Sequence, residues 1–140
     1  KPFIILIGSI KDVEKFGIYL TQKQREFLQN HWPNPLSVVL PCKDEKYQYL
    51  HRGTKSLAFR MPKDEKLLEL LEKVGPLVAP SANVEGEKPS ENIDEAKKYF
   101  GDGVDYYVDG GRIKAKSSTL IKLEKNGQIK ILREGNYKFN

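Results

Sequence analysis

Residues 76–86 read PLVAPSANVEG, and this stretch sets the fold class that we expect. The apolar run at its start is too short for a helix and fits a buried strand, and Ser81 and Asn83 follow at once. Ligands of open α/β sheets bind beyond the carboxyl ends of the strands, so small polar residues there indicate a binding edge. Ser and Asn also form ordinary turns, and this stretch alone leaves both interpretations open.

Strand and helix patterns alternate along the rest of the chain. The expected strands cover residues 3–7, 36–40, 56–61, 77–79 and 105–108. The expected helices cover residues 11–16, 21–32, 64–74 and 92–100, with N-terminal caps at Thr21, Asp64 and Asn92. Asn126-Gly127 predicts a hairpin between residues 119–123 and 128–132, and residues 43–54 have the pattern of a surface connection. This order favours an α/β fold with a mixed sheet, in one domain over residues 1–140.

Composition narrows the class of protein but not its partner. With 39% hydrophobic and 31% charged residues, the chain is typical of soluble globular proteins. No apolar run approaches the roughly 20 residues of a membrane span, so we expect no contact with a membrane. Cys42 is the only cysteine, so we expect a cytoplasmic protein without an internal disulfide. The net charge of +5 allows a nucleotide or RNA partner and is equally consistent with an ordinary solvated surface.

The common catalytic patterns are absent from the sequence. His31 and His51 lie in no metal-binding spacing, and neither a Gly-x-Ser-x-Gly elbow nor a Gly-rich phosphate loop occurs. We therefore expect no protein metal site and assign no catalytic residue. What remains is a set of arginines and small hydroxyls at strand ends, namely Arg60, Arg133, Ser81, Ser117 and Ser118. Such residues bind and orient anionic reactants, although each arginine also fits a surface ion pair.

Six motifs occur in an order and spacing that match one known family. They are WPNPLSVVLP at residues 32–41, LAFRMP at 57–62, PLVAPSAN with Gly86, VDGG at 108–111, Ser118-Thr119, and ILREG at 131–135. Together they resemble the YrdC-like domain of the threonylcarbamoyl-AMP synthase family, over residues 1 to about 135. One of these motifs would be weak evidence, whereas six in the same order are strong evidence.

The resemblance implies a twisted mixed sheet flanked by helices, of the YrdC/RibB-like type, around a concave basic cleft. It also implies synthesis of L-threonylcarbamoyladenylate and pyrophosphate from L-threonine, bicarbonate and ATP, with Mg²⁺ accompanying ATP. The product of that reaction serves the t6A modification at position 37 of tRNA. Proteins that complete t6A, and tRNA or double-stranded RNA, are the partners that follow from it.

The resemblance also assigns roles to individual residues. Arg60 is expected to hold the threonine carboxylate, Ala79 to offer backbone near threonine, and Ser118 to lie at the threonine or carbamate end. The residues expected to contact ATP are Ser56, Ser81, Asn83, Ser90 and Arg133.

The chain departs from the family at several positions. Asn34 replaces a glycine between two prolines, Ser37 and Ser56 stand where threonine is common, and Glu134 stands where proline is usual. The family's Pro-Thr-[Asp/Glu]-Thr strand and Lys-x-Arg motif, which precede the strand at residues 3–7, do not occur in the 140 residues. We therefore expect an N-terminally incomplete YrdC-like domain.

Two other functions fit parts of the same pattern. A non-catalytic YrdC-like module that binds double-stranded RNA or tRNA is favoured by the positive charge and by the missing Lys-x-Arg motif. A carbamoyl-transfer domain similar to the YrdC-like part of hydrogenase maturation factors would need zinc-finger and acylphosphatase-like neighbours. The 140 residues encode neither.

Overall fold

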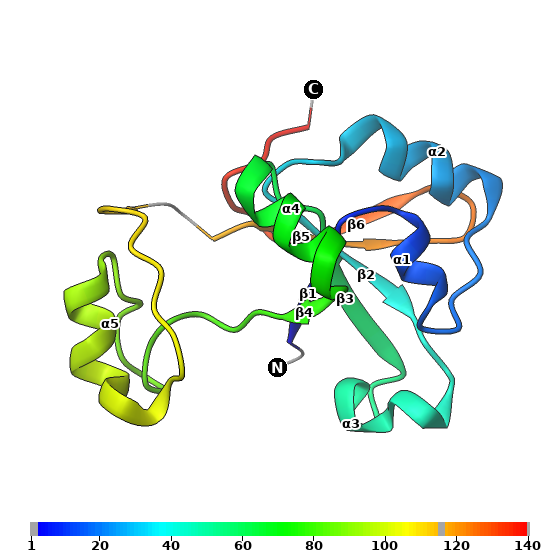
Figure 1. The fold of residues 1–140 in the computed structure, drawn as a ribbon. Coiled ribbons are helices and arrows are strands. Elements are labelled where there is room, and N and C mark those ends of the chain that lie inside the picture. The colour runs from blue at the N-terminus through cyan, green and yellow to red at the C-terminus, as the bar shows by residue number, and fades with distance from the viewer. Residues whose placement is uncertain (1–2, 115–116, 140) are drawn as a thin grey trace. The chain divides into compact units, whose positions relative to one another are not determined.

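A computed structural model describes residues 3–114 and 117–139 (Figure 1). The chain forms two compact units. The sheet unit comprises Lys1–Ala79 and Ser117–Asn140, and the helical unit comprises Pro80–Lys116. Each unit is described by itself below.

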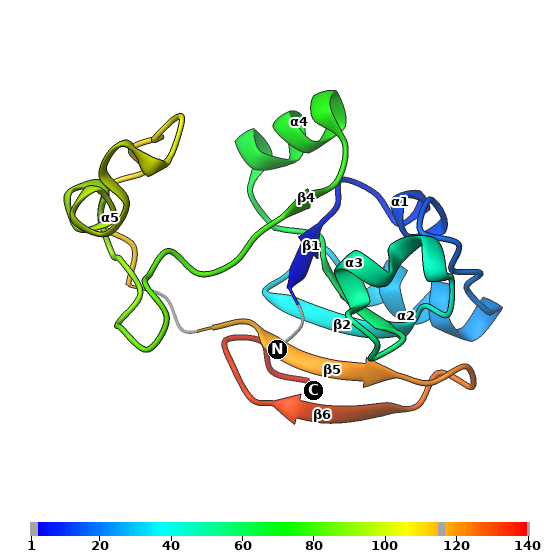
Figure 2. The same ribbon diagram turned by 90° about the horizontal axis from the view of Figure 1, so that it is seen from below.

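The sheet unit is built on six strands in the order β4-β1-β3-β2-β5-β6. β1 is parallel to β3 and β2 is parallel to β5, whereas the other neighbouring strands are antiparallel, so the predicted mixed sheet is confirmed. Figure 2 shows the expected twist, with β1 steeply inclined to β5 and β6. The strands are β1 (Ile4–Leu6), β2 (Leu36–Pro41), β3 (Ser56–Arg60), β4 (Leu77–Val78), β5 (Thr119–Leu123) and β6 (Ile129–Arg133).

The two longest helices of the sheet unit begin at the capping residues that the sequence predicts. Thr21 forms a complete capping box with Gln24 at the start of α2 (Gln22–His31), and the Asp64 carboxylate accepts from the Leu67 N–H at the start of α4 (Glu65–Val74). Shorter helices are α1 (Lys11–Glu14), η1 (Glu45–Tyr47) and α3 (Gln48–His51). Among residues 3–114 and 117–139, no helix is long and apolar enough to cross a membrane.

The hydrophobic core lies on one face of the sheet, here called the core face. Successive strand residues point to opposite faces, so Val38, Phe59 and Ile121 on the three central strands point together into this core. Val13 of α1 and Leu28 of α2 pack into the same cluster. The alternate residues of the strands therefore share the opposite face, here called the second face.

The helical unit contains α5 (Ile93–Phe100) and the short η2 (Gly101–Gly103). Its predicted cap is confirmed, since the Asn92 side chain accepts from the Glu95 N–H. Glu91 connects the two ends of the unit, because its carboxylate lies 2.7 Å from Arg112 and 3.3 Å from Lys88. The backbone N–H of Ile113 also donates to the Glu91 carbonyl at 2.7 Å.

Three sequence predictions about these elements are wrong. β4 is an edge strand paired only with β1, and Leu77 and Val78 are 38% and 45% exposed, so it is not a buried strand. Residues 105–108 form no strand, and the Tyr107 hydroxyl instead donates to the Gly101 carbonyl.

The third wrong prediction concerns residues 43–54, which include η1 and α3. These residues bury His51, whose Nδ1 accepts from the Gly53 N–H. Helices this short show no sustained hydrophobic period, which is why the pattern did not reveal them.

After β6 the chain turns back and lies beside the residues that lead into β5. The Thr119 hydroxyl accepts from the N–H groups of Gly135 and Tyr137 and donates to the Tyr137 carbonyl, at 2.7–3.1 Å. A β-carbon at Gly135 would lie 2.6 Å from the Ser118 carbonyl oxygen and would also overlap the Ser117 carbonyl oxygen. Only glycine therefore allows this close backbone approach.

We expect Gly135→Ala to reduce the free energy of unfolding by roughly 1–3 kcal/mol, because the new methyl group meets backbone atoms that other hydrogen bonds hold in place. Chemical denaturation followed by circular dichroism measures the change. Gly8→Ala is the matched control in the same unit, since its added β-carbon would make only ordinary contacts of 3.5 Å or more. Equal effects of the two substitutions would contradict the proposed backbone contact.

Candidate functional site

Four polar residues form a row across four neighbouring strands on the second face of the sheet. Val38 pairs with Phe59, so Ser37 and Arg60, one position further along each antiparallel strand, stand next to each other. Ser37 pairs with Leu120, and Leu120 pairs with Arg133. Ser118 lies two residues before Leu120 and shares its face. We call Arg60, Ser37, Ser118 and Arg133 the cross-sheet row.

A bulge in β6 places Arg133 in this row. Ile121 pairs with Ile131, but Leu120 pairs with Arg133, so Leu132 is an extra residue in the ladder. Without the bulge, Arg133 would be two residues from Ile131 and would point to the core face with it. The inserted residue instead aims the guanidinium at the second face.

Hydrogen bonds connect three members of the row. Arg133 donates from Nε and Nη2 to the Ser118 carbonyl at 3.2 and 2.9 Å, and from Nη2 to the Ser118 hydroxyl at 3.3 Å. The hydroxyls of Ser118 and Ser37 lie 2.7 Å apart. Arg133 Nη1 has no hydrogen-bond partner in the part of the chain that the structure describes, and it remains available to a ligand.

Arg60, at the end of β3, is a half-buried cation without a described partner. Its Nε is buried and unbonded, and no carboxylate of residues 3–114 or 117–139 forms an ion pair with it. Burial lowers the pKa of the Arg60 guanidinium, because loss of water disfavours the charged form. An arginine nevertheless stays protonated at neutral pH, so this position is fitted to receive an anion.

Two further predicted residues of the sheet unit lie apart from the row. Ser56 begins β3 opposite Pro41, and four residues of extended chain separate it from Arg60 by about 13 Å. Ser56 thus shares the face of Arg60 but lies at the other end of the strand. The Ala79 N–H donates to the Ile4 carbonyl at 2.9 Å, so only the carbonyl of Ala79 is left to face a ligand.

The other three predicted residues lie in one loop of the helical unit. The Asn83 amide donates to the carbonyls of Val84 and Glu87 at 2.9 and 3.1 Å, and the Ser90 hydroxyl donates to the Ala82 carbonyl at 2.6 Å. The Asn83 N–H donates to the Ser81 carbonyl at 3.0 Å. Asn83 Oδ1 is buried and has no partner among the described residues. The loop is therefore ordered by its own side chains, and the ATP contacts assigned to it stay predictions.

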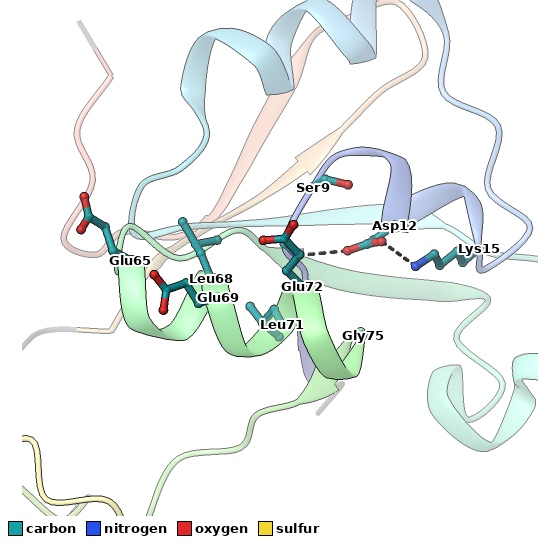
Figure 3. A pocket seen from close by; sticks show the side chains of 10 residues that line it. Ser9, Asp12, Lys15, Glu65, Leu68, Glu69, Leu71, Glu72 and Gly75 are labelled. Atoms are coloured by element: carbon teal, nitrogen blue, oxygen red, sulfur yellow. Dashed lines mark hydrogen bonds and ion pairs between the residues drawn. The ribbon is translucent and has the colours of Figure 1, made fainter.

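A cavity of about 610 Å³ in the sheet unit does not suit an anionic substrate. It lies between the start of α1 and α4, and none of the eight predicted site residues lines it. Figure 3 shows Glu65, Glu69 and Glu72 along α4, on the opposite wall from Asp12 and Lys15. Carboxylates dominate these walls and would repel phosphate groups.

Ser37 is the member of the row that the sequence did not identify as a site residue. It interrupts the apolar strand β2, and its side chain is fully buried. A hydroxyl inside a strand of apolar residues was the available signal, because buried hydroxyls in proteins nearly always have a partner. Its partner Ser118 is 81 residues away, and no local pattern indicates that pairing.

Comparison with known proteins gives consistent matches. A family model for Sua5/YciO/YrdC proteins, described as "Telomere recombination", matches residues 1–135. A putative threonylcarbamoyl-AMP synthase of Mycobacterium tuberculosis is 28% identical over 134 residues, which are 96% of this chain and 62% of that protein. The threonylcarbamoyl-AMP synthase of Pyrococcus abyssi is 31% identical over 126 residues, which are 87% of this chain and 36% of that protein.

A solved structure supports the same relationship. The crystal structure of P. abyssi Sua5 complexed with L-threonine superimposes with a TM-score of 0.84 at 29% identity, over 96% of this chain and 40% of that one. The chain spans less than two thirds of the length of these relatives. With a family model that matches residues 1–135 and with these relatives, the resemblance seen in the six motifs is confirmed, and the chain belongs to the Sua5/YciO/YrdC family.

Proposed function

We propose that this chain provides the threonine-binding part of an L-threonylcarbamoyladenylate synthase. The relatives that carry this name match 87–96% of the chain, and one relative was crystallised with L-threonine. L-threonine, bicarbonate and ATP are the proposed substrates, and the t6A modification of tRNA is the proposed use of the product. Bicarbonate, tRNA and the proteins that complete t6A belong to the proposal through this family relationship.

The observation that carries the proposal is the guanidinium of Arg60, at one end of the cross-sheet row, which has no partner among residues 3–114 and 117–139. A buried donor without a partner costs about 1–3 kcal/mol, and a carboxylate would remove this cost by accepting from the free N–H groups. Arginine and carboxylate also match in geometry, because the planar fork donates two parallel hydrogen bonds. The threonine carboxylate, bicarbonate and the phosphates of ATP all have the matching charge, and the family resemblance assigns the threonine carboxylate to Arg60.

The remaining members of the row suit the rest of the proposed reaction. In this reaction the threonine amine adds to CO₂ with loss of a proton, or to bicarbonate with loss of water, and forms a carbamate. A carbamate oxygen then attacks the α-phosphorus of ATP as the bond to pyrophosphate breaks. Ser118 stands between Arg60 and Arg133 along the row, where its hydroxyl can donate to the threonine carboxylate or, once it has formed, to the carbamate. Arg133 Nη1, which has no partner among the described residues, can donate to phosphate oxygens. These residues would orient the reactants and stabilise charge without a protein nucleophile.

Mg²⁺ enters the proposal with ATP. Mg²⁺ prefers carboxylate and phosphate oxygens, whereas the row offers guanidinium groups and hydroxyls, so the phosphates of ATP would hold the ion. Ser56, Ser81, Asn83 and Ser90 complete the proposed ATP contacts. A cytoplasmic location is part of the proposal and agrees with a single, buried and unpaired cysteine, Cys42.

We expect the intact gene product to release pyrophosphate and form threonylcarbamoyl-adenylate when it is incubated with L-threonine, bicarbonate and ATP. Chromatography of the nucleotide products measures the reaction, with omission of threonine as the control. If no product forms while a related synthase is active in parallel, the enzymatic proposal is wrong.

Arg60→Met should separate binding from stability. The substitution removes a half-buried cation that has no partner among the described residues and keeps a side chain of similar length, so the ligand-free protein should be as stable as the wild type or more stable. Loss of a charge-assisted pair should weaken L-threonine binding at least tenfold, which corresponds to about 1.4 kcal/mol. Calorimetric titration and thermal unfolding measure the two effects. Unchanged threonine affinity would remove Arg60 from the proposed site.

One observation favours a second candidate, a surface that binds RNA. Lys122 and Lys130 pair directly across β5 and β6, on the same face as Leu120 and Arg133. Like charges opposite each other destabilise a sheet, and a bound polyanion would offset this repulsion. The net charge of +5 has the sign that this candidate requires.

For this candidate we expect double-stranded RNA to bind with an affinity that falls steeply as salt increases. The double substitution Lys122→Gln and Lys130→Gln should lower the slope of log K against log salt by about 2, because two phosphate contacts are lost. Fluorescence anisotropy at several salt concentrations measures this slope. An unchanged slope would show that these lysines bind no phosphate.

A further inference from the structure

Ser37 has the surroundings of a hydrogen-bond donor with one possible acceptor. It lies between the core residues Leu36 and Val38, and no part of it is exposed. Among the described residues, its hydroxyl has a single partner, the Ser118 hydroxyl at 2.7 Å. A hydroxyl carries one proton and two lone pairs, and a buried proton without an acceptor costs about 1–3 kcal/mol.

Burial decides which of the two hydroxyls donates. If Ser118 donated to Ser37, the Ser37 proton would have no acceptor at a position that solvent and ligand cannot reach. If Ser37 donates to Ser118, the proton left over belongs to Ser118, which keeps 4% exposure and lies beside the partly exposed Arg133, whereas Ser37 has no exposed surface. The second arrangement is the less costly one.

Arg133 completes the arrangement around Ser118. Its Nη2 donates to the Ser118 hydroxyl at 3.3 Å, and both of its bonded nitrogens also donate to the Ser118 carbonyl. With Ser37 and Arg133 both donating, the two lone pairs of the Ser118 oxygen are occupied. Ser118 can then offer a ligand only its proton.

We propose that Ser37 is a positioning residue that, together with Arg133, fixes Ser118 as a hydrogen-bond donor to an anionic oxygen of the substrate. The proposal rests on the proposed function, in which Ser118 meets the carboxylate or carbamate of threonine. It makes the site selective for an acceptor, because an N–H or ammonium group placed at Ser118 would find no free lone pair. Ser37 acts through Ser118 and touches no substrate.

The direction of the hydrogen bond is tested without a ligand, by unfolding Ser37→Ala, Ser118→Ala and the double variant. Ser118→Ala leaves the Ser37 proton without an acceptor, so it should raise the unfolding equilibrium constant by on the order of tenfold more than Ser37→Ala does. Adding Ser37→Ala to Ser118→Ala should then recover part of the stability. Ser118→Cys, whose sulfur is a weak acceptor, replaces Ser118→Ala if that variant does not fold. A larger loss in Ser37→Ala than in Ser118→Ala would overturn the assignment of the donor.

The role in binding is tested by titrating the same variants with L-threonine. We expect Ser37→Ala to weaken binding on the order of tenfold, and Ser37→Thr, which keeps the hydroxyl, to stay within about twofold of the wild type. In the Ser118→Ala background, Ser37→Ala should have no further effect on affinity, because its only route to the ligand is gone. Equal effects of Ser37→Ala in both backgrounds would overturn the positioning role. A wild type that binds no L-threonine would refute the proposed function, and the unfolding measurements would still decide the direction of the hydrogen bond.

Discussion

The bulge at Leu132 is the constraint on which the candidate site depends. A regular β6 would turn the Arg133 side chain toward the core face, the face on which Ile121 is buried. The extra residue reverses the orientation of Arg133, and its guanidinium then reaches the carbonyl and hydroxyl of Ser118. Next to Ser118, the Thr119 hydroxyl accepts from the Gly135 N–H, and Gly135 lies against the backbone of Ser117 and Ser118. Side-chain and backbone contacts together thus fix the start of β5, and these contacts determine the position of Ser118.

The two ends of the cross-sheet row differ in how their charge is compensated. Arg133 uses part of its guanidinium to hold the protein's own backbone, and it remains partly exposed. Arg60 makes no such bond from Nε and is partly desolvated. A group that is costly in the free protein and satisfied in a complex is the expected sign of a binding position rather than of a structural one. Both residues are arginines at strand ends in the sequence, but in the structure Arg133 donates to backbone and hydroxyl groups, whereas Arg60 Nε has no partner among the described residues.

Features that depend on neighbouring residues could be predicted from the sequence, whereas features that depend on distant residues could not. Thr21, Asp64 and Asn92 cap their helices as expected, and Asn126-Gly127 forms the turn of the β5–β6 hairpin, because each of these patterns acts within a few residues. The failures required information from distant residues. Residues 105–108 carry strand-forming side chains but have no pairing partner among the described residues. β4 has the composition of a buried strand, but it lies at the edge of the sheet.

The candidate site shows the same difference between local and distant sequence information. Arg60, Ser118 and Arg133 were identified from residue type and motif, yet a regular alternation along β6 would have placed Arg133 on the wrong face. Ser37 was noted only as a substitute for threonine, because its role depends on a hydroxyl 81 residues away. Threonine and serine share the hydroxyl and differ by one methyl group, so a requirement for a donor at this position permits both. In the proposed arrangement the row requires from β2 only a hydroxyl proton directed at Ser118, so serine at position 37 is compatible with it.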